Sequence, residues 1–146
     1  MFKFDKLVFG DSGWGDEFLI ATIMTLLVSI MSMGLGLCIA IITVWAKLVQ
    51  NKISRLLANF YTTVIRGVPE LLVIYLIFFG GNAVVMKIAK IFGYNGYIEL
   101  NAFTIATIAI ALISATYSSE VLRAAFLSIS KGQLEAARAL GMNRFS

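Results

Sequence analysis

The feature that most constrains this chain is a run of 29 consecutive uncharged residues from Phe18 to Ala46, most of them Ile, Leu, Val, Met or Ala. About 20 apolar residues are enough for a helix to cross the hydrocarbon core of a bilayer, so the run predicts a spanning helix over residues 18–46. A secretory signal peptide is the competing interpretation. It is excluded because the run is too long and because acidic residues, Asp16 and Glu17, precede it. Lys47 marks the point where the helix leaves the membrane.

Two further apolar stretches follow, over residues 56–81 and 102–123. The second of these is uncharged from Ala102 to Ser119 and then continues as a more polar helical segment. Each stretch is long enough to cross a bilayer. The connection between them, from Gly80 to Asn101, contains an apolar segment over 83–92 that we expect to form a short helix at the membrane interface.

The stretch over 56–81 is interrupted near its middle by Gly67 and Pro69. Proline lacks a backbone N–H and its ring clashes with the carbonyl four residues earlier, so the helix should break or kink here. Small residues in the first stretch, Gly34, Gly36 and Ala40, are placed where a neighbouring helix could approach closely. The sequence therefore predicts an all-α integral membrane protein with three spanning helices in a single domain over residues 1–146.

Composition agrees with this fold class and excludes several kinds of chemistry. Hydrophobic residues make up 60% of the chain and charged residues 14%, whereas soluble domains are about 45–50% apolar. The chain has no histidine, which excludes a histidine base or metal ligand, and its single cysteine, Cys38, lies in an apolar run and is expected to be a small buried hydrophobic residue. We predict no catalytic residue, no metal site and no cofactor bound by this chain.

Basic residues gather in two places, over 47–66 and over 131–146. This pattern is typical of membrane orientation rather than of nucleic-acid binding, because cytoplasmic segments of membrane proteins carry an excess of Lys and Arg. We expect the segment after the first span and the C-terminal tail to lie in the cytoplasm. The N-terminus would then lie outside.

The tail predicts a separate short helix over residues 130–141. Ser130 and Gln133 have the spacing of a capping box, and Gly141 is well placed to end the helix in a left-handed conformation. The helix is too polar to span a membrane. From helix chemistry alone, a solvated terminal helix and a docking helix for another protein are both open.

Four segments, taken in order, resemble one family. They are Arg66-Gly67-Val68-Pro69-Glu70 with the Leu-rich run after it; Tyr117, Glu120 and Arg123; Gly132-Gln133; and Glu135-Ala136-Ala137 followed by Gly141. Together they resemble the permease subunits of bacterial ATP-binding-cassette amino acid importers, in the polar amino acid branch that includes histidine, lysine/arginine, glutamine and opine systems. The last segment is similar to the EAA loop of those permeases. The resemblance runs from about Gly15 to the end of the chain.

The resemblance implies that the helix over 130–141 is a coupling helix that sits in a cleft of a cytoplasmic ATPase subunit. Glu135 would make a polar contact with the ATPase, Ala136 and Ala137 would keep the helix slim, and Gly141 would permit the turn after it, with Gly132 and Gln133 part of the same motif. ATP and Mg²⁺ would be bound by the partner, since the chain contains no Gly-x-x-x-x-Gly-Lys-Ser/Thr loop. The other implied partners are a second permease, identical or homologous, a periplasmic substrate-binding protein and an amino acid, in the bacterial inner membrane.

Four charged residues have two interpretations. Arg66, Glu70, Glu120 and Arg123 lie in or beside apolar stretches, where charges are costly and face a bundle interior or a water-filled path. In the first interpretation they line a translocation path. In the second, which we favour, Arg66 pairs with Glu70 and Glu120 pairs with Arg123 to hold helices together. On the path interpretation, Glu120→Gln should abolish uptake and leave assembly intact.

In the family an Ile-x-Leu-Pro segment and about two further spans follow the EAA helix, of about five spans in all. We therefore expect the chain to be a C-terminally truncated part of a longer permease, since Arg144-Phe145-Ser146 matches the middle of a family motif. One alternative is an inactive, naturally truncated permease. A second alternative is a small three-span protein that assembles into an oligomeric channel or adaptor, without an ATPase.

Overall fold

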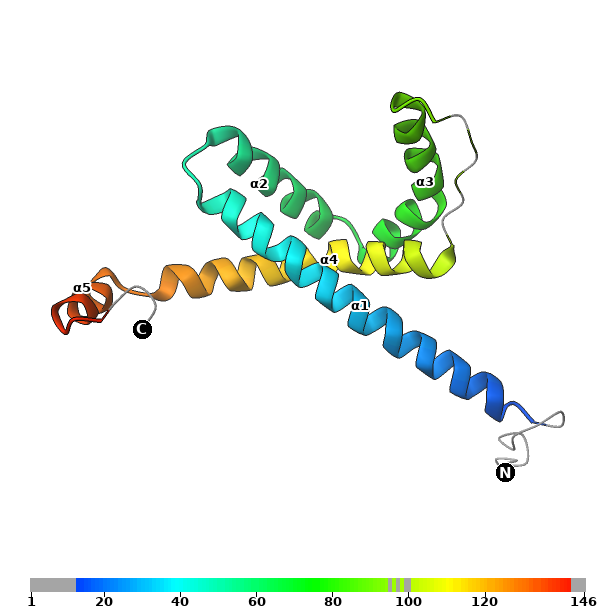
Figure 1. Cartoon of the computed structure of the whole chain (residues 1–146), viewed down its shortest axis with the longest axis horizontal. Coiled ribbons are helices and arrows are strands. Elements are labelled where there is room, and N and C mark those ends of the chain that lie inside the picture. The colour runs from blue at the N-terminus through cyan, green and yellow to red at the C-terminus, as the bar shows by residue number, and fades with distance from the viewer. Residues whose placement is uncertain (1–12, 95, 97, 99–100, 143–146) are drawn as a thin grey trace.

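The computed structural model of the chain describes residues 13–94, 96, 98 and 101–142, and these form five α-helices and no strand (Figure 1). The helices are α1 (Gly15–Leu48), α2 (Lys52–Gly67), α3 (Glu70–Ile91), α4 (Ala102–Ser128) and α5 (Lys131–Ala139). The all-α fold class is confirmed. The charged N-terminal segment over 1–12 and the family-like residues 143–146 lie outside the described residues.

Three of these helices, α1, α3 and α4, are long and apolar enough to cross a membrane. With a rise of about 1.5 Å per residue, the 34 residues of α1 extend about 51 Å, well beyond the roughly 30 Å of a hydrocarbon core. The uncharged run over residues 18–46 predicted this long helix, because it contains no proline that would interrupt the backbone hydrogen bonds and no charge that would be costly in a membrane. The described chain therefore has the three predicted spanning candidates.

The bounds of the middle span differ from the sequence prediction. Residues 56–81 do not form one segment, because the chain breaks at Val68 and Pro69 as the proline predicted. Val68 is extended, with φ −111° and ψ 142°, which is the conformation that a following proline favours. The helix before the break, α2, carries polar residues along one face and is not a spanning candidate. The middle span is α3 alone.

The predicted connection from Gly80 and the separate interfacial helix over 83–92 are also corrected. Helix α3 continues without a break through Gly80 and Gly81 to Ile91. Glycine weakens a helix in water, but in an apolar medium an unpaired backbone group costs far more than glycine's flexibility, so the helix persists. The chain turns instead at Gly93, whose φ of +82° is accessible to glycine without steric strain.

The core of the described chain is the crossing of α1 and α4, which run in the same general direction and form the centre of Figure 1. Small residues let the two backbones meet: a Cβ on Gly36 of α1 would lie 3.1 Å from the Ala111 carbonyl oxygen of α4. Ala40 of α1 and Ala109, Ala111 and Ala115 of α4 are fully buried. The hydroxyl of Ser32 adds a buried hydrogen bond to the Thr107 carbonyl at 3.1 Å. This is the packing that small residues at four-residue spacing permit in membranes.

Two expectations for α1 are wrong. Gly34 has open space where a Cβ would lie, so it does not contribute to the crossing, and Cys38 is exposed rather than buried. Both lie on the turns of α1 next to Gly36, but about 200° around the helix from it, because successive residues of an α-helix are separated by about 100°. The face that α4 covers is therefore the one through Gly36 and Ala40.

Around this crossing the other helices are spread apart (Figure 1). Helix α2 folds back along the C-terminal half of α1, α3 returns from the centre along the N-terminal half of α4, and α5 stands beyond the C-terminal end of α4. Most large apolar side chains of α1 and α3 are exposed, and Val73 is the one buried residue within α3. Such surfaces suit lipid or neighbouring helices rather than water.

Candidate functional site

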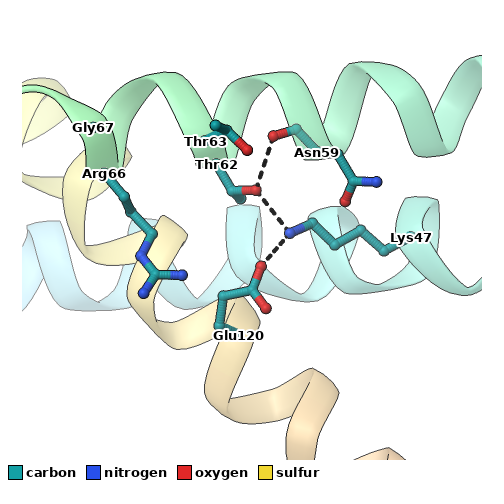
Figure 2. Close-up of a pocket in the computed structure, with 7 residues that line it drawn as sticks. All are labelled: Lys47, Asn59, Thr62, Thr63, Arg66, Gly67 and Glu120. Carbon is teal, nitrogen blue, oxygen red and sulfur yellow. Dashed lines mark hydrogen bonds and ion pairs between the residues drawn. The ribbon is translucent and has the colours of Figure 1, made fainter.

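A polar pocket of about 390 Å³ lies where α1, α2 and α4 meet (Figure 2). Each helix contributes: α1 its last turn, α2 its second half and α4 the part after its buried alanines. The residues that line the pocket are Lys47, Asn59, Thr62, Thr63, Arg66, Gly67 and Glu120. The pocket therefore brings Arg66 and Glu120, two of the charged residues singled out from the sequence, to one place.

Lys47 is the most deeply buried charge in this pocket, with a side chain that is 2% exposed. Its ammonium donates a hydrogen bond to the Thr62 hydroxyl, with 2.8 Å between Nζ and Oγ1, and forms an ion pair with Glu120 Oε1. The Thr62 hydroxyl in turn donates to the backbone carbonyl of Ala58 at 3.1 Å or of Asn59 at 3.2 Å. One ammonium thus ties together α1, α2 and α4.

Glu120 is more open than Lys47, with a side chain 30% exposed. Its second carboxylate oxygen lies 3.7 Å from the guanidinium of Arg123, three residues later on α4. The predicted pairing of Glu120 with Arg123 is therefore present, although it is long and Arg123 is 43% exposed. The shorter and more buried partner of Glu120 is Lys47.

Tyr117 joins the two sides of the proline break. Its hydroxyl donates to Glu70 Oε1 at 2.8 Å, and the guanidinium carbon of Arg66 lies 5.5 Å from the centre of its ring. Glu70 is the first residue of α3, where the helix dipole also favours a carboxylate. Arg66 and Glu70 do not form the ion pair predicted from the sequence. The pairing needs both residues in one helix, and the break at Pro69 places them in two.

Sequence reasoning missed the role of Lys47 and of the Thr62 hydroxyl. Lys47 was assigned only as the end of the first span. A signal was present nevertheless: Lys47 and Glu120 are each the first charge after a long uncharged run, and the predicted orientation places both at the same side of the membrane. Two opposite charges at one depth are natural partners.

Helix α5 holds the second group of predicted residues. The capping box is confirmed: the Ser130 hydroxyl accepts from the Gln133 N–H at 3.3 Å, and the Gln133 side chain accepts from the Ser130 N–H at 3.4 Å. At the other end, the N–H of Met142 donates to the Ala137 carbonyl at 3.1 Å, and Gly141 has a φ of +77°. These are the hydrogen bond and the left-handed residue of a Schellman motif.

The α5 segment is open to solvent on the described chain. Gly132, Gln133, Glu135 and Ala136 are exposed, and Ala137 is half-buried. Leu140, just after the helix, is 82% exposed. The segment is thus a short helix that is capped at both ends and has an exposed apolar residue beside it.

The groups that line the pocket suit the binding of a polar ligand. Hydroxyl, amide, guanidinium and carboxylate groups line it, and among the described residues no three carboxylates or cysteines lie close enough together to hold a metal ion. Such a set can hydrogen-bond a polar ligand and balance its charges.

Comparisons with known proteins place these features in a family. Residues 34–146 match the family model described as "Binding-protein-dependent transport system inner membrane component". Among curated proteins, the chain is 45% identical over 137 residues to the nopaline transport system permease protein NocQ of Agrobacterium fabrum, covering 93% of this chain and 58% of that protein. It is 35% identical to the histidine/lysine/arginine/ornithine transport system permease protein HisQ of Escherichia coli, covering 90% of this chain and 58% of that protein.

A solved structure is similar as well. The crystal structure of an amino acid ABC transporter with histidines matches with a TM-score of 0.63 and 33% sequence identity, over 84% of this chain and 51% of that one. The chain thus spans a little more than half the length of the curated relatives it matches.

Proposed function

Because the chain belongs to the family of binding-protein-dependent transport system inner membrane components, we propose that it provides helices of the membrane-spanning subunit of an ATP-driven importer for amino acids or opines. The names of the relatives support this cargo class, since they include nopaline, octopine and histidine/lysine/arginine/ornithine permease proteins. The relatives are transport subunits, and ATP hydrolysis would be carried out by a partner.

The observation that carries this proposal is the exposed helix α5. Its order of residues, Glu135-Ala136-Ala137 and then Gly141, is that of the EAA loop, and both ends of the helix are capped within the chain itself. In the proposed role α5 docks on a cytoplasmic ATPase subunit that binds ATP and Mg²⁺. Glu135 makes a polar contact there, while Gly132 and Gln133 shape the first turn of the helix.

Movement of α5 would reach the pocket through α4, because α4 is one continuous helix from Ala102 to Ser128 and only Ile129 and Ser130 separate it from α5. Glu120 lies on that helix, two turns from its end. We propose that the pocket is part of the translocation path, with Arg66 and Glu120 facing the cargo and Glu70 and Arg123 holding the helices that carry them. Gly67 and Pro69 supply the break that ends α2 beside the pocket.

The proposed assembly contains a second permease, identical or homologous, two ATPase subunits and a periplasmic substrate-binding protein, in the inner membrane of a bacterium. The proposed orientation places the N-terminus outside and α5 in the cytoplasm. Two features support it. In Figure 1, α1 and α4 run in the same general direction, so that the C-terminal end of α1 and helix α5 both lie toward the left of the view. The end of α1 and the start of α2 carry the basic residues Lys47, Lys52 and Arg55.

Glu135→Ala tests the proposal. The permease would be co-expressed with its ATPase, and both ATPase co-purification and substrate-stimulated ATP hydrolysis would be measured. We expect a severalfold loss of both, because α5 loses its polar contact while its caps remain. Lys52→Ala is the matched control, since it removes an exposed charge from the N-terminus of α2 instead.

Unchanged co-purification and unchanged hydrolysis with Glu135→Ala would contradict the coupling role. That result would favour the other candidate, a small oligomeric channel or adaptor, because such a protein has no ATPase to bind and tolerates the loss of Glu135.

A further inference from the structure

The position of Lys47 is unusual for a lysine near the end of a spanning helix. Such a lysine normally extends its ammonium outward, toward the lipid headgroups and water. Here the side chain points inward along α1, and its ammonium lies between Thr62 of α2 and Glu120 of α4 (Figure 2). A cation that is 2% exposed needs a compensating anion, and Glu120 supplies it.

The charges that line the pocket are therefore unevenly available to a ligand. The lining residues carry two cations, Lys47 and Arg66, and one carboxylate, Glu120. The carboxylate is occupied twice, by Lys47 at one oxygen and more loosely by Arg123 at the other. Arg66 contacts the face of Tyr117, and the ion pairs among the described residues do not include it.

We propose that Lys47 is an internal counter-ion that sets the charge preference of the pocket. While Lys47 holds one oxygen of Glu120, its ammonium balances the charge of the one carboxylate that lines the pocket. The cationic end of a ligand that reaches the other oxygen, which Arg123 holds loosely, therefore meets an already neutralised carboxylate. The native pocket should thus distinguish weakly between a cationic amino acid and its neutral isostere. This inference rests on the proposed transport path and adds to it a residue that determines specificity.

Arginine and citrulline are the probes that test it, because they differ only in whether the side chain ends in a charged guanidinium or a neutral ureido group. Their dissociation constants would be measured on the full-length permease in complex with its ATPase in lipid nanodiscs. The soluble binding protein is left out so that the ratio of the two constants reports the membrane pocket.

We expect the native complex to bind the two amino acids within about threefold of each other. Lys47→Met should shift the ratio about tenfold toward arginine, because Glu120 then loses its buried counter-ion and keeps only the loose contact with Arg123. Its Oε1 can accept a charge-assisted hydrogen bond from the guanidinium. Lys47→Arg should keep the native ratio, since it retains a cation at the same place. Lys47→Met combined with Glu120→Gln should return to the native ratio, because the carboxylate that favours arginine is gone.

This set of variants separates a specificity role from a structural one. If Lys47 only holds the helices together, Lys47→Met weakens both amino acids alike, the ratio stays constant, and the inference is refuted. If that variant does not assemble, Lys47→Gln, which keeps a hydrogen-bond donor toward Thr62, replaces it under the same criteria. A native complex that binds neither amino acid would refute the pocket as a transport path, and this inference with it, whereas the Glu135→Ala test of ATPase coupling is decided independently.

Discussion

Gly36 offers a quantitative test of how α1 and α4 are held together. A Cβ added to Gly36 would lie 3.1 Å from the backbone carbonyl oxygen of Ala111 and 3.4 Å from the side chain of Ser114. Ordinary contacts between carbon and a carbonyl oxygen are about 3.3–3.6 Å. Because the nearest atom belongs to helical backbone, it cannot rotate away, and the helices must separate by a few tenths of an ångström.

Gly34→Ala is the matched control, because it makes the same change on the same helix where a Cβ meets nothing within 4 Å. Both substitutions gain up to about 1 kcal/mol of intrinsic helix propensity, so the difference between them isolates the packing cost. That cost should be about 1–3 kcal/mol, the range for overfilling a packed interior. Gly36→Ala should therefore be less stable than Gly34→Ala by that amount.

The measurement is reversible unfolding of the purified protein in mixed detergent micelles, followed by near-ultraviolet circular dichroism. Separation of α1 from α4 would also weaken the hydrogen bond between Ser32 and the Thr107 carbonyl, which lies one turn away in the same interface. Equal unfolding free energies for the two alanine variants would refute the close crossing at Gly36 and with it the packing described for α1 and α4.

Three further predictions concern single hydrogen bonds or charges. Tyr117→Phe should lower the free energy of unfolding slightly, because it removes the donor to Glu70 and keeps the ring beneath Arg66. The loss should vanish in a Glu70→Ala background, which lacks the acceptor, and an undiminished loss there would contradict the contact. Ser130→Ala should reduce the stability of α5 by about 1 kcal/mol, because it removes the hydroxyl that accepts from the Gln133 N–H. The loss would be measured as faster hydrogen exchange of the Gln133 amide, and unchanged exchange would contradict the cap. From the sequence alone, Glu120→Gln is expected to spare assembly. In the structure this change leaves the buried Lys47 without its anion, so thermal unfolding experiments should show a free energy of unfolding that is lower by about 1–3 kcal/mol. Native stability of the variant would contradict the ion pair.

Local features of the fold could be predicted from the sequence because each rests on chemistry within a few neighbouring residues. The break at Pro69 follows from a missing N–H, and the cap at Ser130 follows from a hydroxyl and an amide three residues apart. The exposed helix α5 follows from its polarity. For the same reason the bounds of α3 could not be predicted: Gly80 and Gly81 look like a connection by their water-based propensity, whereas a membrane-spanning segment keeps its backbone hydrogen bonds.

The candidate pocket could be predicted only in part. Arg66 and Glu120 stand out because charges inside apolar stretches are rare, and the structure places both at the pocket. Which residues they pair with did not follow from proximity in sequence. The neighbours Glu70 and Arg123 were the expected partners, but Arg66 instead contacts Tyr117, and the closest partner of Glu120 lies 73 positions away.

The sequence by itself therefore determined that this chain lies in a membrane, how many spanning helices its described part has and where helix α5 begins and ends. These properties depend on the length of apolar runs and on local backbone chemistry. Only the tertiary structure decided that Gly36 rather than Gly34 meets α4, and that Lys47 turns inward to Glu120. Both depend on the angle and depth at which α1 crosses α4, which is set by the fit of two helix surfaces distant in sequence.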